Sequence, residues 1–417
     1  MNTIGKYVLS ITALIFITSC GNNNNTSNSG AMSSSKAEKV YVAPGEHDEY
    51  YAFMSGGYSG NLTVYGLPSG RMLKEIPVFS QFPTSGYGYS EETKPMLNTS
   101  FGFVPWGDSH HPDISQTNGE LDGRWIFINE NNTPRIARIS LETFETEEII
   151  ELPNSAGNHA SSFVTENTEY IVAGTRFAVP NPQRDMPISE MKGQFKGPLS
   201  FVSIADNGHL NLEFQLNMPG FNYDLAHPGR NKSHGWFFFT SYNTEEANTL
   251  MEVNASQNDK DYIAAVNWKK VVEYVKNGGG KKVAGTYAHN VYDEKTHTAT
   301  STMKEGVISV NPSEVEGAVY YIPIPKSPHG CDVDPSGEYI IGSGKLSTDL
   351  SVYSFEKMLT AIENKDFVDD AYGIPVLSYE NTIAGVVKQP GLGPLHTEFD
   401  GQGNAYTTFF ISSEVVK

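Results

Sequence analysis

The chain has 417 residues, of which 12% are aromatic, and it carries a formal net charge of −19 with only two cysteines. The length suits one large domain or two ordinary ones, and 22 Tyr with 22 Phe can build a substantial core. The negative charge argues against nucleic acid or an anionic membrane surface as a partner. Two cysteines exclude a disulfide framework and a cysteine-based zinc site.

Residues 1–20 are predicted to be a lipoprotein signal peptide. Lys6 supplies the positive charge, residues 7–18 form a short apolar core, and residues 17–20 read as a lipobox that ends at Cys20. The apolar run is too short to span a bilayer. We therefore expect cleavage before Cys20 and a periplasmic protein that is anchored to the membrane by lipid on this cysteine.

Residues 21–47 are predicted to be a low-complexity linker between the lipid and the folded domain. Asn and Ser dominate its first half, and few apolar residues are available for packing.

Residues 48–417 read as an all-β domain. Short aromatic strands such as 50–54, 125–128 and 236–240 alternate with turns rich in Gly, Pro, Asn and Asp. Repeated units of an acidic turn followed by an aromatic strand favour the blades of a β-propeller over a sandwich. Two segments have apolar residues near helical spacing, 262–276 and 355–363, and we expect both to be helices outside the ring.

Five histidines recur just ahead of such turns and strands: His110, His111, His159, His329 and His396. From the last three of them to the aromatic residue of the next strand the distances are eleven, ten and ten residues. Equivalent positions in several blades converge on one axis, so these side chains are predicted to form a multi-histidine metal site. Imidazole suits Cu, Zn, Fe and Ni, and the scarcity of cysteine and clustered carboxylates favours copper or zinc.

Two details of this site follow from strand geometry. Neighbouring strand residues point to opposite faces, so His110 and His111 can share a site only from irregular backbone, which Pro112 helps to provide. By position alone, His227 is the best rival ligand because it also precedes an aromatic strand.

At these motifs the sequence resembles nitrous oxide reductase, from about residue 50 to the last residue. The motifs that carry the resemblance are Asp108-Ser109-His110-His111-Pro112, Asp122-Gly123-Arg124, Arg135-Ile136-Ala137-Arg138, Phe238-Phe239-Thr240-Ser241-Tyr242-Asn243, Ser327-Pro328-His329-Gly330, Gly344-Lys345-Leu346-Ser347, Gly391-Leu392-Gly393-Pro394-Leu395-His396-Thr397 and Phe399-Asp400-Gly401-Gln402-Gly403-Asn404-Ala405-Tyr406.

The resemblance implies a seven-bladed β-propeller followed by a cupredoxin domain. The propeller of that family holds a tetranuclear copper–sulfide cluster on seven histidines, and the cupredoxin domain holds a dinuclear copper centre that supplies electrons. The reaction reduces nitrous oxide to dinitrogen and water. The five histidines carry over as cluster ligands and catalytic residues, whereas His227 matches no ligand. An electron donor such as a c-type cytochrome or a cupredoxin, and a homodimer, are also implied.

The resemblance further implies a calcium site built from oxygen ligands, which suit this ion. The matching positions are Tyr242, Glu245, Val253, Asp259 and Ser327, where Val253 would offer its carbonyl and Ser327 replaces the usual Asn.

The sequence departs from the family in several places. Ala160 stands where a Gly usually follows the third histidine, and a twin-arginine signal is absent, as in the atypical, Sec-exported branch. Two cluster histidines and the cupredoxin domain are missing, with no Cys-x-x-x-Cys motif in the chain. We therefore expect an incomplete propeller that is inactive alone. The alternatives are a non-enzymatic propeller lipoprotein that binds a partner, and a lipoprotein for copper handling.

Overall fold

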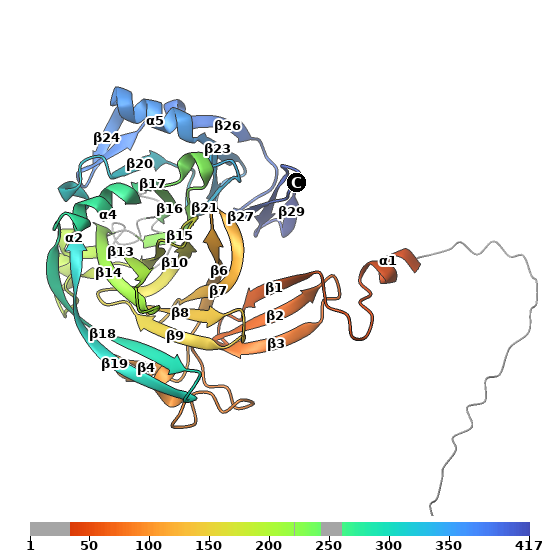
Figure 1. Ribbon diagram of the computed structural model, residues 1–417. Helices are drawn as coiled ribbons and strands as arrows, with labels where there is room; N and C mark the ends of the chain where they lie inside the picture. The colour runs from red at the N-terminus through yellow and green to blue at the C-terminus, as the bar shows by residue number, and fades with distance from the viewer. Residues whose placement is uncertain (1–33, 221, 243–260) are drawn as a thin grey trace, which may run out of the picture.

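The computed structural model describes residues 34–220, 222–242 and 261–417. Its antiparallel sheets are arranged around one axis as a β-propeller (Figure 1). Each antiparallel group of three or four strands around the axis is called a blade below and is numbered in chain order. The prediction of an all-β fold is therefore confirmed. The described strands form six blades, whereas the resemblance implied seven. No strand pairing joins blade 6 to blade 1 within the described part.

The first three blades come from the N-terminal half. Blade 1 consists of β1 (Tyr50–Ser55), β2 (Asn61–Leu67) and β3 (Met72–Pro77). Blade 2 consists of β6 (Ser109–Thr117), β7 (Glu120–Glu130), β8 (Arg135–Ser140) and β9 (Thr146–Glu151). Blade 3 consists of β10 (Ala156–Val164), β11 (Ile171–Phe177), β13 (Phe195–Ile204) and β14 (Leu210–Pro219), and β12 (Val179–Pro180) pairs with β13.

The other three blades follow. Blade 4 consists of β15 (Asn222–Pro228), β16 (Trp236–Tyr242), β17 (Tyr262–Asn267) and β20 (Val319–Pro323). Blade 5 consists of β21 (Pro328–Val333), β22 (Tyr339–Gly344), β23 (Leu350–Ser354) and β26 (Ile383–Val387). Blade 6 consists of β27 (Pro394–Phe399), β28 (Ala405–Phe409) and β29 (Glu414–Val416).

The first strands of the blades lie innermost. Strands β1, β6, β10, β15, β21 and β27 contact one another in that order around the axis. Leu225 of β15 even pairs with Gly330 of β21 in a parallel bridge. A side chain of one of these strands that points toward the axis therefore lies close to side chains from the neighbouring blades.

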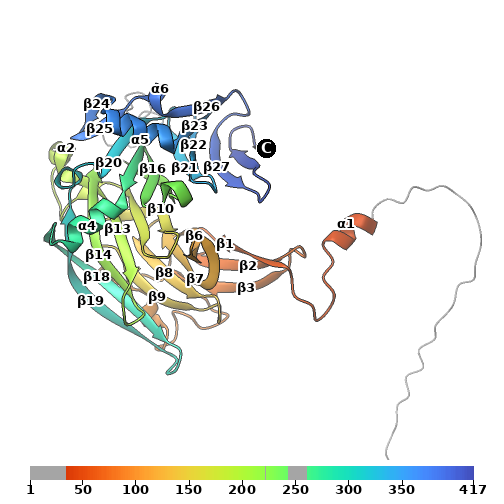
Figure 2. The ribbon, with the colours of Figure 1, turned by 45° about the horizontal axis from the view of Figure 1, so that its top comes forward.

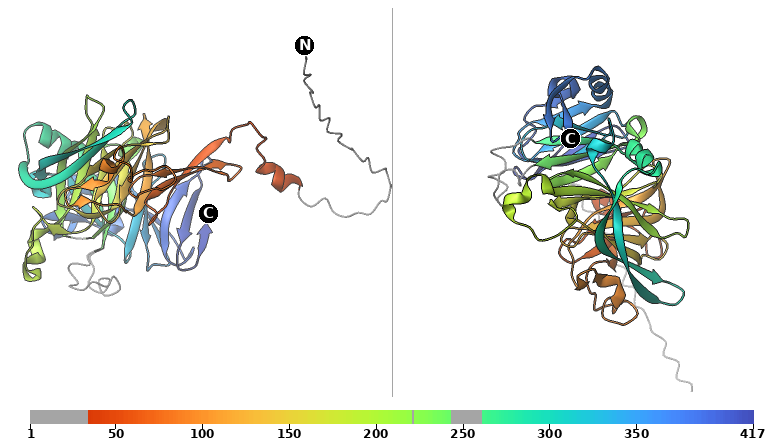
Figure 3. Two further views of the ribbon diagram at one scale, coloured as in Figure 1. Left: turned by 90° about the horizontal axis from the view of Figure 1, so that it is seen from below. Right: turned by 90° about the vertical axis from the view of Figure 1, so that its left-hand side faces the viewer.

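Additional elements lie at the outside of the ring. A long hairpin of β18 (Lys281–Asp293) and β19 (Thr298–Val310) pairs with β9 of blade 2 on one side and with β14 of blade 3 on the other (Figure 2). A shorter hairpin of β24 (Phe367–Ala371) and β25 (Ile374–Leu377) extends blade 4 through β20. Blade 1 extends from the ring toward α1 (Ser34–Lys39) (Figure 3).

The core lies between neighbouring blades, so each middle strand is buried on both faces. In β16, Phe237 and Phe239 pack into the layer between blades 3 and 4, whereas Trp236 and Phe238 pack into the layer between blades 4 and 5. Alternate residues of a strand point to opposite faces, which explains why these strands read as unbroken apolar runs.

The helix predicted over residues 262–276 was partly wrong, because its first residues form a strand that is buried on both faces. Residues 262–267 form β17, and the helix α4 begins only at Trp268 and ends at Lys276. Ile263 and Val266 look helical in spacing, but they belong to a strand with both faces buried. Asn267 caps α4 by accepting a hydrogen bond from the Lys270 amide at 3.2 Å.

The second predicted helix is confirmed. Helix α5 spans Phe355–Asn364 and packs on the outside of blade 5, next to α6 (Tyr379–Thr382). Among the described residues, no helix is long and apolar enough to span a membrane.

Candidate metal centre

The structure brings all five predicted histidines together on the propeller axis. Their ring centroids lie 4.9–5.9 Å apart along a continuous set of contacts: His110–His111, His110–His159, His111–His159, His111–His396, His159–His329 and His329–His396. The five rings come from β6, β10, β21 and β27, the innermost strands of four blades. Imidazoles from separate sheets therefore form one cluster.

A register shift of the kind that a β-bulge produces occurs in each of the four strands that carry a histidine, and it aims these side chains at the axis. The register between the inner strand and its partner slips next to His110, His159, His329 and His396. A bulge bends the strand locally and re-aims a side chain that regular pleating would send to a blade face.

The bulge in β6 also allows the adjacent residues His110 and His111 to point into one site. His111 adopts a left-handed backbone with φ of 45°, which is uncommon for a residue with a side chain. The register slips over the same residues, between His110 and Asp113. The two imidazoles thus lie on the same side with centroids 5.3 Å apart, as the sequence requires for a shared site.

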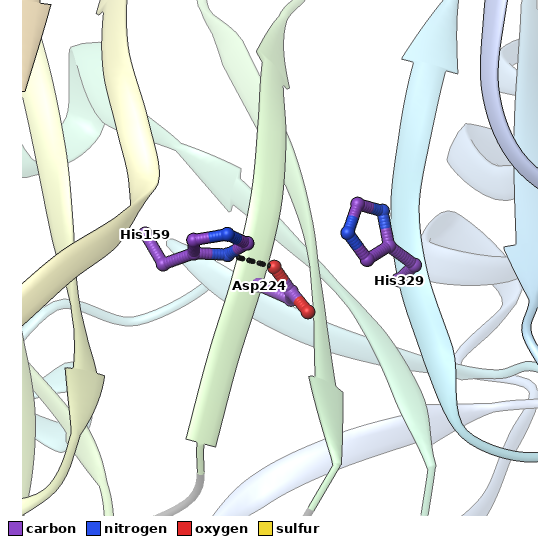
Figure 4. A group of neighbouring side chains, drawn as sticks. All are labelled: His159, Asp224 and His329. Atoms are coloured by element: carbon purple, nitrogen blue, oxygen red, sulfur yellow. Dashed lines mark hydrogen bonds and ion pairs between the residues drawn. The ribbon is translucent and has the colours of Figure 1, made fainter. Parts of the chain in front are cut away.

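Asp224 completes the cluster and was missed by the sequence analysis. It lies on β15, the inner strand of blade 4, beside a further bulge between Asp224 and Ala226. Its carboxylate shares a hydrogen bond with Nδ1 of His159, and Figure 4 shows it between His159 and His329. Ligand atoms of these three residues lie within 4.8 Å of one another, so they form a candidate metal-binding group.

The rival ligand His227 follows three residues later on the same strand and does not join the cluster. Its Nδ1 lies 2.8 Å from the carbonyl oxygen of Pro228, and its Nε2 lies 3.1 Å from Nη2 of Arg230. Both ring nitrogens are therefore engaged elsewhere. The blade 4 inner strand presents Asp224 at the level where the other four strands present histidine.

A second carboxylate lies on the opposite side of the cluster. Oδ1 of Asp108 is 3.1 Å from Nδ1 of His110. The Asn131 side-chain amide donates to Oδ2 of Asp108 at 3.2 Å and fixes the carboxylate in place. Carboxylate partners of this kind orient a metal-binding imidazole and increase its basicity.

Burial disfavours the protonated form of four of the five imidazoles. Burial, assisted by neighbouring imidazoles, lowers the pKa of His329 to about 3 and that of His111 well below its ordinary value. Burial also lowers the pKa of His110 and His396. Neutral imidazole is the form that binds metal ions, so the cluster is ready to coordinate metal at neutral pH.

The carboxyl group of Asp224, in contrast, favours its charged form. Burial alone would raise the pKa of its carboxyl group, but His329 and His159 outweigh this effect and hold the pKa far below its usual range. The cluster therefore combines imidazoles with a buried carboxylate whose charged form is favoured. Nδ1 of His329 is buried and forms no hydrogen bond to the described residues, as expected of an atom that is available to a metal. Such a donor set fits copper.

The predicted calcium site lies mostly outside the described residues. Glu245, Val253 and Asp259 are not described, and only the backbone of Tyr242 is. Ser327 is buried, with a left-handed backbone at φ of 53°, and its amide donates to Oδ2 of Asp261 at 2.7 Å. The carboxylate next to Ser327 in the structure is thus Asp261, which the sequence analysis did not select.

Fold and site together define a β-propeller with a candidate metal centre on its axis. The resemblance to nitrous oxide reductase is confirmed by comparison with known proteins. The chain is 34% identical to the nitrous-oxide reductase of Stutzerimonas stutzeri over 385 residues, which are 91% of this chain and 54% of that protein. It is 33% identical to the nitrous-oxide reductase of Pseudomonas fluorescens over 404 residues, or 96% of this chain and 57% of that protein.

The chain is thus a homologue of the nitrous-oxide reductases, and it spans about half the length of these relatives. No protein-family model matches the chain. Among solved structures, hydrazine synthase of Kuenenia stuttgartiensis matches with a TM-score of 0.53 and 14% identity, covering 88% of this chain and 79% of that one. This likeness concerns the fold alone.

Proposed function

We propose that the chain is the propeller part of a nitrous-oxide reductase and that its five-imidazole cluster holds copper. The observation that carries this proposal is the convergence of His110, His111, His159, His329 and His396 on one axis. Homology to proteins of that name supports the reaction, in which nitrous oxide, two protons and two electrons give dinitrogen and water. When bound, copper and sulfide would supply electrons to nitrous oxide at adjacent metal ions.

The residues of the chain would prepare this centre. Imidazoles from four blades would hold the copper, and the direction of each ring is set by a register shift in a buried strand. Asp224 orients the ring of His159 through a hydrogen bond to Nδ1, and the Asp108 carboxylate lies 3.1 Å from Nδ1 of His110. Asp224 also contributes negative charge that offsets part of the positive charge of the copper ions.

A non-enzymatic propeller that binds a protein partner is the alternative from another class. Binding of a protein partner does not explain why five imidazoles from four different strands point to one place. A copper-handling lipoprotein remains the second alternative, and the two copper proteins differ in whether the complete protein turns over nitrous oxide.

Copper binding to this chain tests the proposal. Purified protein, stripped of metal, is titrated with copper(I) under anaerobic conditions, and bound copper is counted after gel filtration. We expect copper on the wild type and loss of most of it in His329→Ala. His297→Ala is the matched control because His297 is a turn residue of the outer hairpin. Equal copper on all three proteins would refute the proposal.

Several further features belong to the same proposal. Electrons would come from a dinuclear copper centre in a cupredoxin domain and, before that, from a c-type cytochrome or a cupredoxin. The complete protein would be a homodimer, anchored in the periplasm through Cys20 and stabilised by calcium next to Ser327.

A further inference from the structure

The backbone at His396 is held by side chains of two other strands, because the ladder between β27 and β28 is interrupted there. The register of this pair shifts between Pro394 and Thr397. Within the shift, the amide of His396 donates to Oγ1 of Thr408 at 3.2 Å. The amide of Thr397 donates to Oδ2 of Asp332 at 2.7 Å. Asp332 belongs to β21, so one of the two acceptors comes from blade 5.

The contact from blade 5 matters because blade 6 shares no strand pairing with its neighbours. Within the described residues, its three strands form a sheet of their own. Two hydrogen bonds to blade 5 bracket His396. The first runs from the Gly393 amide to the Ser347 carbonyl oxygen at 3.2 Å. The second is the bond to Asp332, which is buried, with Asp332 6% and Thr397 2% exposed.

We propose that Asp332 is a positioning residue of the axial centre: it anchors the Thr397 amide so that the His396 ring stays in the cluster. The His396 centroid lies 4.9 Å from that of His329 and 5.9 Å from that of His111. Metal-binding side chains must be held within about 0.5 Å of their productive geometry. Loss of the anchor should therefore weaken metal binding although no ligand is removed. This consequence rests on the proposed function, whereas the position of the ring can be measured without metal.

The same arrangement occurs between blades 2 and 3. Asp113 of β6 follows His110 by three residues, just as Asp332 follows His329. Oδ2 of Asp113 accepts a hydrogen bond at 2.9 Å from the amide of Val164 on β10, the inner strand of the next blade. In both strands the spacing His-x-x-Asp thus brings an imidazole to the cluster and a carboxyl group to the backbone of the following blade.

The anchor works in either charge state of Asp332. Burial raises the pKa of this carboxyl group to about 8, although the hydrogen bond from Thr397 lowers it; the nearby charges of Glu398 and Arg230 act in opposite directions. A protonated carboxyl group still accepts a hydrogen bond at its carbonyl oxygen. Asp332→Asn keeps such an oxygen and is the conservative variant, whereas Asp332→Ala and Asp332→Leu remove the acceptor.

The first measurement is magnetic resonance on the metal-free full chain with isotope-labelled histidine. The imidazole signals of His396 are identified by their loss in His396→Gln. Asp332→Ala should shift or broaden these signals, because a ring on unanchored backbone samples several positions. Asp332→Asn should leave them at their wild-type positions. The signals of His297, which is in the turn of the outer hairpin, are the internal reference and should not move.

The second measurement is copper(I) affinity, determined by competition with a chelator. Asp332→Ala should lower it roughly tenfold, as loss of an outer partner does, and Asp332→Asn should restore it. In His396→Ala protein, Asp332→Ala should have little further effect, because changes that act through one side chain are not additive. Asp334→Ala is the matched control. Asp334 accepts from the Ser336 and Tyr339 amides in a turn of the same blade, so this variant should lower stability and leave copper affinity unchanged.

The two measurements separate this inference from the proposed function. A wild-type protein that binds no copper would refute the reductase proposal, and the His396 signals would then decide the role of Asp332. Unmoved signals in Asp332→Ala, or a loss of copper affinity that is equal with and without His396, would overturn the inference. An effect of Asp332→Asn as large as that of Asp332→Ala would do the same. Asp332→Leu, which is closer to the wild type in volume, gives the same test if Asp332→Ala does not fold.

Discussion

His111 and His159 meet edge to face with ring centroids 4.9 Å apart, although one belongs to blade 2 and the other to blade 3. The contact exists only when the two sheets are docked and the bulges in both inner strands are formed. The candidate metal centre is therefore a tertiary feature, and we expect changes to single side chains around it to affect metal binding more than folding.

Replacement of Asp224 by Asn tests the role of this carboxylate. The amide keeps the volume and one acceptor oxygen but removes the negative charge beside Nδ1 of His159. We expect copper affinity to fall about 10–100-fold, as for other outer partners of metal-binding imidazoles, with an unchanged circular dichroism spectrum. Competition with a copper(I) chelator measures the affinity, and wild-type affinity in Asp224→Asn would show that the carboxylate plays no part.

The buried imidazoles predict how the metal-free protein responds to acid. The pKa of His329 is about 3 in the folded chain, against an ordinary value of 6.5. Between these values the unfolded chain binds a proton that the folded chain does not, so stability falls as the pH falls from 6.5 toward 3.

The melting temperature, followed over this range, should decline less steeply in His329→Gln than in the wild type. His297→Gln serves as the control and should follow the wild type. An unchanged slope in His329→Gln would contradict the assignment of this imidazole as buried and neutral.

The layer between blades 4 and 5 predicts a large loss of stability on truncation of Phe238. Its side chain is completely buried and meets Phe355 edge-on with centroids 6.2 Å apart. Phe238→Ala should lower the free energy of unfolding by about 3–5 kcal/mol. Urea unfolding measures this value, and Phe101→Ala, at a residue that is 78% exposed, should change it by less than about 0.5 kcal/mol.

Calcium dependence tests the predicted oxygen site. Glu245→Gln with Asp259→Asn should lower the melting temperature in calcium but not in a chelator. At calcium about 100-fold above its Kd, the stabilisation that is lost amounts to about 2.7 kcal/mol. Asp261→Asn is the informative companion, because Asp261 contacts Ser327 directly. Equal losses with and without calcium would mean that these carboxylates do not hold the ion.

Lipid attachment at Cys20 is tested by Cys20→Ser in cells that express the whole precursor. The lipobox predicts that this variant leaves the membrane fraction for the soluble fraction. Cys331→Ser is the matched control, since Cys331 is buried in the propeller. Continued retention of Cys20→Ser in membranes would argue against a lipid anchor.

The histidines could be predicted from the sequence because each lies in a local motif next to a turn. Asp224 could not, because an aspartate in a strand has many ordinary roles and only the packing of blade 4 brings it to His159. The start of α4 was missed because β17 buries both faces, which removes the alternation that marks a strand. Bulges also leave no simple trace in sequence, apart from Pro112, Pro328 and Pro394 beside three of them.

The bulges have a consequence for how such a chain can change over evolutionary time. One residue inserted or deleted near His111 or His329 would turn the following side chains to the other face of the strand and send the imidazole into a blade. The hairpins at the outer edges carry no such constraint, since their turns face solvent. Length variation among relatives should thus accumulate at the perimeter, as in β18–β19, while the strands around the axis keep their residue count.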